Sequence, residues 1–190
     1  MRVERNSQSF QQLIELLSRD EVAIMACDTI YGFVGKAPIT EQQIREIKGR
    51  GETKPFLLLI ADRENLNDLK VKLPEDSAIL DLWPGPFTFV FALQEGGTIA
   101  VRVPEDERLR DLVRQVGPLY STSVNRAGEA PLDSPEHIEK EFGQEVALIE
   151  DSGVFTGRLP STVVALHESS VRILRQGAGE VPSSYLSTIL

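Results

Sequence analysis

The sequence predicts an α/β fold, because helix-like and strand-like patterns alternate along the chain with short connections between them. Phe10, Leu13 and Leu17 recur at helical spacing, and the short apolar run 22–26 that follows is typical of a buried strand. The alternation continues to the C-terminus without an internal repeat or a clear linker. The chain has 190 residues, close to the usual size of one domain, so we expect a single domain over residues 1–190.

Helix starts are marked by capping residues and prolines. Ser7 and Ser9 are candidate caps of the first helix, Thr40 with Gln43 suggests a capping box, and Pro74 opens a third helix. The run 84–86, Pro-Gly-Pro, ends that third helix. The expected helices cover residues 10–17, 40–47, 74–82, 105–116, 135–142 and 182–186.

Short apolar runs between these helices predict the strands. A turn over residues 95–97, Glu-Gly-Gly, joins two of them into a hairpin. The expected strands cover residues 22–26, 56–60, 87–93, 99–103, 120–123, 146–149, 162–166 and 171–174.

Composition excludes several classes of protein. The formal charge of −9 argues against a protein that binds nucleic acid over its whole surface, although this charge is compatible with a local basic cleft. The single Cys27 excludes an internal disulfide framework, and two distant histidines, His137 and His167, do not predict a zinc site. The polar N-terminus does not resemble a signal peptide, and no apolar run reaches membrane-spanning length, so we expect a cytoplasmic protein.

Polar clusters follow several of the predicted strands, where open α/β sheets usually place ligands. The segment from Lys48 to Lys54 carries three cations and two glycines and is either a solvated loop or an anion clamp. Arg102 lies within an apolar strand and needs an anionic partner, either a core carboxylate or that of a substrate. Small hydroxyl side chains recur in the other clusters, around residues 28–29, 121–123 and 161–162. Cations and hydroxyls at strand ends together suggest one polyanion site.

Seven motifs follow one another along the chain, and they read D-T-x-Y-G, K-x-R-x-x-x-K-P, W-P-G-P-x-T, R-x-P, S-T-S-x-N-x-x-G, P-S-T-V-V and I-L-R-x-G. In this order and spacing they resemble the YrdC/Sua5 family of threonylcarbamoyl-AMP synthases, and the resemblance runs from about Phe10 to Gly179. It implies a twisted mixed sheet with flanking helices around a concave basic cavity. It also implies the synthesis of L-threonylcarbamoyl-adenylate from L-threonine, bicarbonate and ATP, with release of pyrophosphate. Partner proteins would then transfer the threonylcarbamoyl group to adenosine 37 of tRNAs, which is the t6A modification.

The resemblance also implies roles for individual residues. The cations that would act on the phosphates are Lys48, Arg50 and Lys54. The contacts of L-threonine would be Thr29, Arg102, Ser121 and Ser161. Those of ATP would be Arg50, Lys54, Thr98, Ser123, Asn125 and Arg175. No metal ligands are expected from the protein, and Mg²⁺ would arrive with ATP, held mainly by phosphates and water.

The chain departs from the family's usual pattern at a few positions. Its first motif reads Ala26-Cys27-Asp28-Thr29 instead of P-T-[DE]-T, and Leu59 stands where some members have a histidine. Ala127 replaces a serine, and Pro131-Leu132 replaces a serine-bearing stretch. Three alternatives to the synthase therefore stay open: a divergent YciO-like paralogue that binds nucleotide or RNA, an RNA-binding module with weak tRNA contact, and a carbamoyl-handling domain like that of hydrogenase maturation proteins.

Overall fold

A computed structural model describes residues 1–49, 51, 55–75, 77–167 and 170–186. Within these residues, ten strands form one mixed sheet in the order β1-β8-β2-β3-β7-β4-β6-β5-β9-β10. The strands are β1 Arg2–Glu4, β2 Ala23–Ala26, β3 Tyr31–Lys36, β4 Leu57–Leu59, β5 Phe87–Ala92, β6 Thr98–Arg102, β7 Leu119–Ser123, β8 Leu148–Asp151, β9 Thr162–Leu166 and β10 Val171–Arg175. The α/β fold with a mixed sheet and flanking helices is thus confirmed.

The helices are α1 Ser7–Ser18, α2 Glu41–Lys48, α3 Glu107–Val116 and α4 Pro135–Phe142, and three 3₁₀ segments are η1 Arg63–Leu69, η2 Ser77–Leu82 and η3 Ser183–Tyr185. The predicted helix 74–82 is therefore only a 3₁₀ segment that begins at Ser77, and the predicted last helix is a single 3₁₀ turn. Both segments are too short to form the ladder of hydrogen bonds that stabilises an α-helix.

Two predicted helix caps are wrong. The side chain of Asn6 caps α1 by accepting hydrogen bonds from the amides of Gln8 and Ser9, and the hydroxyl of Ser9 accepts one from the amide of Asn6. Thr40 precedes α2, but its hydroxyl donates to the carbonyl of Lys36, so the predicted capping box does not form. A Ser or Thr hydroxyl that makes a hydrogen bond to another local backbone group is not available to cap the helix.

Strands β1 and β3 were not predicted. In β3, the glycines at positions 32 and 35 interrupt the apolar pattern, and β-propensity is low for glycine. Pairing across the sheet nevertheless holds β3 in place, since it lies antiparallel to β2 on one side and to β7 on the other. Tertiary pairing therefore overrides the weak local signal.

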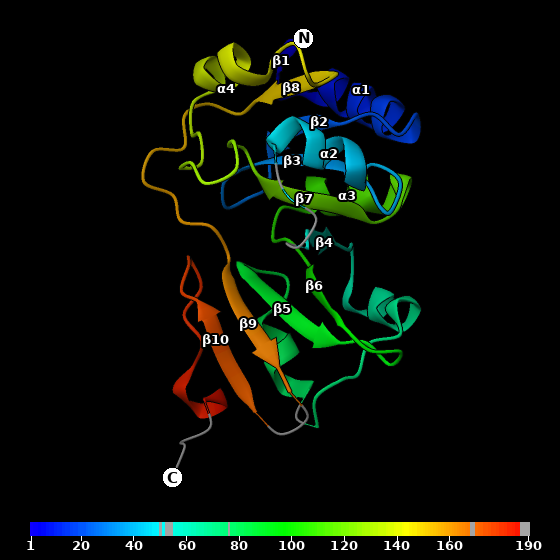
Figure 1. Cartoon of the computed structure of the whole chain (residues 1–190), viewed down its shortest axis with the longest axis vertical. Coiled ribbons are helices and arrows are strands. Elements are labelled where there is room, and N and C mark those ends of the chain that lie inside the picture. The colour runs from blue at the N-terminus through cyan, green and yellow to red at the C-terminus, as the bar shows by residue number, and fades with distance from the viewer. Residues whose placement is uncertain (50, 52–54, 76, 168–169, 187–190) are drawn as a thin grey trace.

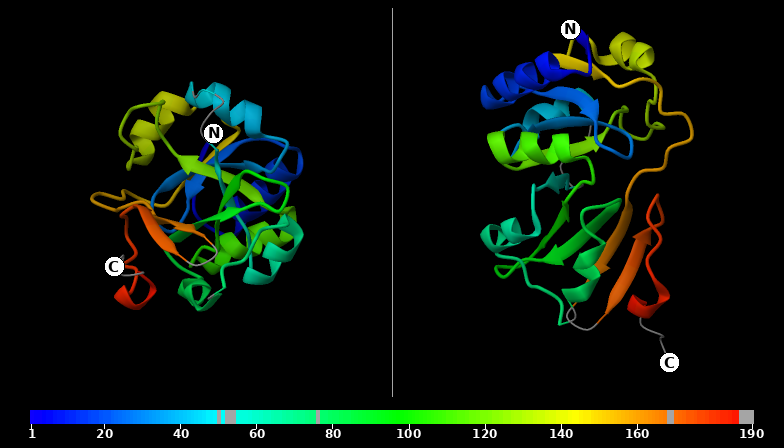
Figure 2. Two further views of the ribbon diagram at one scale, coloured as in Figure 1. Left: turned by 60° about the horizontal axis from the view of Figure 1, so that its bottom comes forward. Right: turned by 180° about the vertical axis from the view of Figure 1, so that it is seen from behind.

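The sheet separates two layers of helices in the upper half of Figure 1. Apolar residues of α1 and α3 pack on one face, around Leu13, Leu112 and Leu119, and those of α2 and α4 pack on the other, around Ile44 and Phe142. Seen from behind, α1 and α3 lie next to each other (Figure 2). In the part of the chain that the structure describes, none of the helices has the length and apolar character needed to cross a membrane.

A third apolar cluster fills the lower half of the molecule. It joins η1 and η2 to β5, β6 and β9 and includes Trp83, whose ring lies 5.0 Å from that of Phe89. The indole Nε1 donates to the carbonyl of Phe87 at 2.7 Å, which fixes the Trp-Pro-Gly-Pro corner as a structural element. The connection from β8 to β9 runs down one side of the molecule and links the upper strands to the lower ones (Figure 1).

Candidate functional site

A cavity of about 350 Å³ is lined by residues of both the upper strands, such as β3 and β7, and the lower strands, such as β5 and β9. Its walls come from β3, β4, β5, β6, β7, β9 and β10 and from the segments that precede β3, β4 and β9. Six residues that the sequence proposed for ligand binding line it: Thr29, Arg102, Ser121, Ser123, Ser161 and Arg175. The structure thus brings together residues that are up to 146 positions apart in the chain (175 − 29).

Arg102 is the last residue of β6, and only 2% of it is exposed. Its Nε donates to the carbonyl of Gly85 at 2.9 Å, and its Nη1 donates to the hydroxyl of Thr29 at 3.1 Å. Its Nη2 donates to the carboxylate of Asp28, at 2.7 and 2.8 Å from the two oxygens. The anionic partner that a buried arginine needs is therefore a carboxylate of the protein, and a second N–H of Nη1 is left for a ligand.

Asp28 holds Arg102 from behind the cavity wall. It adopts a left-handed backbone conformation with φ of 56°, and its carboxylate also accepts hydrogen bonds from the amides of Thr29 and Glu105. Burial raises the pKa of the Asp28 carboxyl, against the opposing effect of Arg102, and burial lowers the pKa of Arg102, against the effect of Asp28. In the sequence, Asp28 stands only as part of a motif. Two signals could have predicted its pairing with Arg102: a carboxylate next to Thr29, and an arginine within an apolar strand that needs an anionic partner.

Cys27, Gly32 and Ser121 form one end of the cavity. The thiol of Cys27 lies 3.7 Å from the hydroxyl of Ser121, and burial raises the pKa of this thiol to about 12. A Cβ atom at position 32 would lie 2.8 Å from Sγ of Cys27 and 2.9 Å from Oγ of Ser121, so only glycine leaves room for both groups. A thiol that stays protonated is not a nucleophile, so the geometry gives Cys27 a packing role.

Hydroxyls and a second arginine line the part of the cavity contributed by the lower strands. The hydroxyl of Ser161 lies 2.8 Å from that of Thr88, a wall residue that ends the W-P-G-P-x-T motif but was given no ligand role from the sequence. Arg175, at the end of β10, donates through Nη2 to the carbonyl of Ser161 at 2.7 Å, and burial lowers its pKa. Because this bond uses one nitrogen of the guanidinium, the remaining N–H donors can reach an anion in the cavity.

Lys48 does not face the cavity, so the prediction that it contacts phosphates is not supported. Its side chain lies in the interior, where Nζ donates to the carbonyl of Ser123 at 2.5 Å and to both the carbonyl and Oδ1 of Asn125, at 2.9 and 3.0 Å. An ammonium that is surrounded by protein oxygens in this way serves to position the Ser123–Asn125 segment.

Asn125 is likewise buried and absent from the cavity wall. Thr98 is exposed on β6, two residues before the wall residue Ala100, and does not line the cavity either. Arg50 and Lys54, which the sequence also proposed, lie outside the described residues. Among the residues that the structure does describe, no three His, Cys, Asp or Glu side chains come together as metal ligands.

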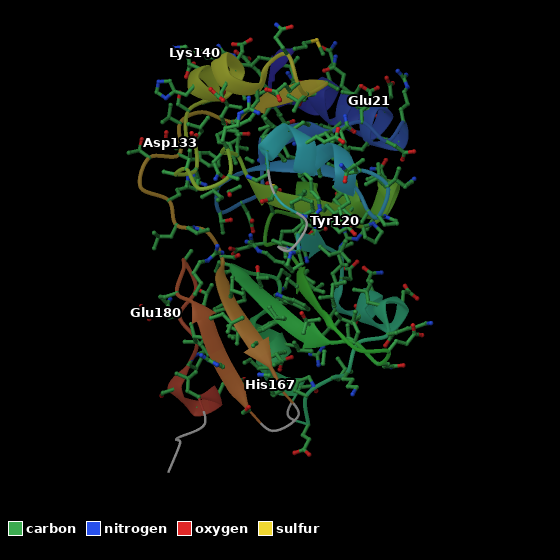
Figure 3. All side chains as sticks on the ribbon, viewed as in Figure 1. Glu21, Tyr120, Asp133, Lys140, His167 and Glu180 are labelled. Atoms are coloured by element: carbon green, nitrogen blue, oxygen red, sulfur yellow. The ribbon has the colours of Figure 1, made fainter. Side chains whose placement is uncertain are left out.

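The two histidines are exposed and lie away from the cavity. His137 is on α4, and His167 follows β9 at the strand end opposite to Ser161, near the bottom of Figure 3. Neither histidine is among the residues that line the cavity with Cys27.

Residues 15–177 match the family model Sua5_yciO_yrdC, which carries the description "Telomere recombination". Over 187 residues the chain is 28% identical to the threonylcarbamoyl-AMP synthase of Bacillus subtilis (strain 168), an alignment that covers 90% of this chain and 54% of the relative. The chain therefore spans about half the length of that relative.

Two solved structures share the fold. The crystal structure of Pyrococcus abyssi Sua5 complexed with L-threonine superposes with a TM-score of 0.82 at 26% identity, covering 93% of this chain and 57% of that one. The crystal structure of Escherichia coli YciO superposes with a TM-score of 0.82 at 22% identity, covering 98% of both chains. The order and spacing of the sequence motifs, the shared fold and the match to the family model agree, and the chain belongs to the Sua5/YciO/YrdC family.

Proposed function

We propose that the protein is a threonylcarbamoyl-AMP synthase, which joins L-threonine, bicarbonate and ATP to L-threonylcarbamoyl-adenylate and releases pyrophosphate. The observation that carries this proposal is the convergence of Thr29, Arg102, Ser121, Ser161 and Arg175 on one cavity. Their chemistry, two guanidinium groups among small hydroxyls, suits a ligand pair with a carboxylate and a polyphosphate. The name and bound ligand of the relatives support the same assignment.

In this reaction the protein has to orient two substrates that repel each other. The amine of threonine attacks the carbon of bicarbonate, water leaves, and a carbamate forms. An oxygen of the carbamate then attacks the α-phosphorus of ATP, and the bond to the departing pyrophosphate breaks. Both partners of the second step are anions, so positive charge at the cavity wall lowers their repulsion and stabilises the transition state.

Arg102 would hold the threonine carboxylate. Three anchors, the carbonyl of Gly85, the hydroxyl of Thr29 and the carboxylate of Asp28, restrict the guanidinium before any ligand arrives. A fixed guanidinium loses little freedom when it binds a carboxylate, and this keeps the reacting amine in place. Because Asp28 balances the charge of Arg102, the recognition of the carboxylate rests on the hydrogen bond from the remaining N–H of Nη1 more than on net charge.

Arg175 would contact the triphosphate, together with Arg50 and Lys54, whose roles rest on the sequence. Mg²⁺ would enter as the ATP complex and be held by phosphates and water, since the carboxylate of Asp28 is already committed to Arg102. The adenylate would pass to proteins that modify tRNA, and we place this step in the cytoplasm.

The proposal is tested by pyrophosphate release from the purified protein with ATP, Mg²⁺, L-threonine and bicarbonate. We expect release that requires all three substrates, and Arg102→Ala should raise the KM for threonine at least tenfold with little effect on the KM for ATP, because it removes a charge-assisted carboxylate contact. Arg172→Ala, an exposed arginine of β10 that does not line the cavity, is the matched control.

A folded protein that releases no pyrophosphate under these conditions would reject the synthase. Calorimetry and a gel-shift assay would then separate two of the alternatives: binding of ATP without threonine favours a YciO-like protein, and a salt-dependent shift of tRNA in a gel favours an RNA-binding module.

A further inference from the structure

We propose that Arg45, a residue of α2 that does not line the cavity, is a positioning residue for ATP binding: it contacts both ends of the segment 51–56 and thereby positions Lys54, the one cation of that segment, for the triphosphate. The inference rests on the proposed function, because the ligand that Lys54 would meet is ATP. Arg45 belongs to none of the seven sequence motifs, so this role does not follow from the resemblance.

The guanidinium of Arg45 joins α2 to the chain that follows it. Its Nη1 donates to the carbonyl of Gly51 at 2.9 Å, and its Cζ lies 4.7 Å from the centre of the Phe56 ring. Only 9% of the Arg45 side chain is exposed, so water replaces these contacts poorly when they are lost. Because Gly51 precedes Lys54 and Phe56 follows it, one side chain contacts the chain on both sides of that lysine.

Glu41, one turn earlier in α2, fixes the orientation of this guanidinium. Its Oε1 accepts from Nε and Nη2 of Arg45, at 3.1 and 2.6 Å, and its Oε2 accepts from the hydroxyl of Tyr120 at 3.3 Å. Tyr120 belongs to β7 (Figure 3), and its ring lies 5.8 Å from that of Phe56. The four side chains therefore form a closed ring of contacts. An ion pair within an exposed helix contributes little by itself, but this one directs Nη1 of Arg45 toward Gly51.

The same contacts extend to the cavity wall. Phe56 is 4% exposed and lines the cavity together with Pro55 and with Leu57, the first residue of β4. A cation in a short segment that is held at both ends has less conformational freedom to lose when it binds an anion. Since Arg45 is not part of the wall, we expect it to act on ATP through that segment and not by contact with the nucleotide.

Calorimetry of Arg45→Met with Mg²⁺-ATP and, separately, with L-threonine tests the inference. Methionine keeps an apolar stem over Phe56 and removes the donors, so the Kd of ATP should rise about three- to tenfold, while the Kd of threonine stays at the wild-type value. Arg19→Met is the matched control, because Arg19 also pairs with a glutamate four residues earlier, Glu15 at 4.0 Å, and does not line the cavity. This control should bind both ligands as the wild type does.

Glu41→Ala separates positioning from a simple effect of charge. Removal of the positive charge of Arg45 weakens ATP binding by Coulomb's law alone, but removal of the negative charge of Glu41 would strengthen it. If Glu41 orients Arg45, Glu41→Ala instead weakens ATP binding, against the change in net charge. Unchanged or tighter binding of ATP in this variant would contradict the inference. The side chain of Glu41 is 41% exposed, so Glu41→Ala also carries the test if Arg45→Met does not fold.

A double-mutant cycle with Lys54→Ala shows whether Arg45 acts through Lys54. In the Lys54→Ala background, Arg45→Met should have little further effect on the Kd of ATP, because the cation that it positions is gone. Effects of the two substitutions that add in full would overturn the inference. Equal weakening of ATP and threonine in Arg45→Met would overturn it as well, since a general loss of structure produces that result.

The wild type distinguishes the two levels of the proposal. A folded wild-type protein that binds no ATP would overturn the proposed function and this inference together. Wild-type binding of ATP that is unchanged in folded Arg45→Met would overturn the inference alone and leave the synthase in place.

Discussion

Burial determines the protonation state of Cys27, one of the side chains that line the cavity. The residue is 4% exposed, and its thiol lies within hydrogen-bond distance of the carbonyl of Met25 and the hydroxyl of Ser121, both at 3.7 Å. Loss of hydration is the main reason why the pKa of the thiol rises from 9.0 to about 12, and the hydroxyl of Ser121 opposes that rise. The folded protein thus keeps this thiol neutral over the physiological range.

The raised pKa of Cys27 predicts a loss of stability at alkaline pH. Above about pH 9 the unfolded chain releases the thiol proton while the folded chain retains it, so the free energy of unfolding should fall as the pH rises from 9 toward 12. Below pH 9 both states hold the proton and the contribution is constant. Urea titrations of the wild type and Cys27→Ala between pH 7 and 11 measure this effect, and a difference between the two proteins that does not change with pH would contradict it.

At the scale of elements, hydrogen bonds from the segment after β10 hold the start of β9, next to Ser161. The hydroxyl of Thr162 donates to the carbonyl of Gly179 at 2.6 Å and accepts from the amides of Gly177 and Gly179. A Cβ atom at position 177 would collide with the carbonyl of Pro160 and the backbone of Ser161. The I-L-R-x-G motif therefore ends in a glycine because two backbones pass each other there.

Gly177→Ala should destabilise the protein by about 1–3 kcal/mol and weaken threonine binding, because the added methyl group pushes Ser161 out of place. Gly51→Ala, where a Cβ would meet no atom within 4 Å, should leave the free energy of unfolding unchanged. Urea denaturation measures the free energy of unfolding of both variants, and threonine titration measures their affinity for the ligand. Together they test whether the close approach of the two backbones at Gly177 matters. Equal stability of the two variants would show that the backbones can separate at no cost.

At the scale of the whole molecule, the cavity depends on both halves of the sheet. Cys27, Gly32 and Ser121 come from the upper strands and the turn after β2, while Thr88 and Ser161 come from β5 and the start of β9. The connecting strands β4 and β6 carry Leu59 and Arg102, which are paired in register. A ligand in this cavity therefore contacts strands that are far apart in the sequence and lie together only in the folded chain.

Binding of ligand should therefore stabilise the folded chain as a whole. At a concentration of one hundred times its Kd, a ligand that binds only the folded state adds about 2.7 kcal/mol to the free energy of unfolding. We expect ATP with Mg²⁺ and L-threonine each to raise Tm, and D-threonine at the same concentration to raise it less. Thermal unfolding monitored by circular dichroism measures the shift, and identical shifts with the two enantiomers would show that the amino acid is not held by a shaped site.

The sequence by itself determined the α/β class, most strands and helices, and six of the residues that line the cavity. Apolar periodicity predicts helices and strands because it reflects which side of each element is buried. An arginine within an apolar strand, such as Arg102, indicates a buried ion pair. The motifs also include Ser123 and Arg175, which the structure places in the cavity wall, and their predicted contact with ATP stays a prediction.

The tertiary structure decided what local patterns do not encode. Lys48 reads as a phosphate contact in the sequence, but the segment at the end of β7 surrounds its ammonium with oxygens. The strand β3 forms because β2 and β7 pair with it, against the preference of its glycines. Whether a polar side chain faces a cavity or the interior depends on which distant segments pack beside it, and the free energy of that packing belongs to the folded chain rather than to any local stretch of sequence.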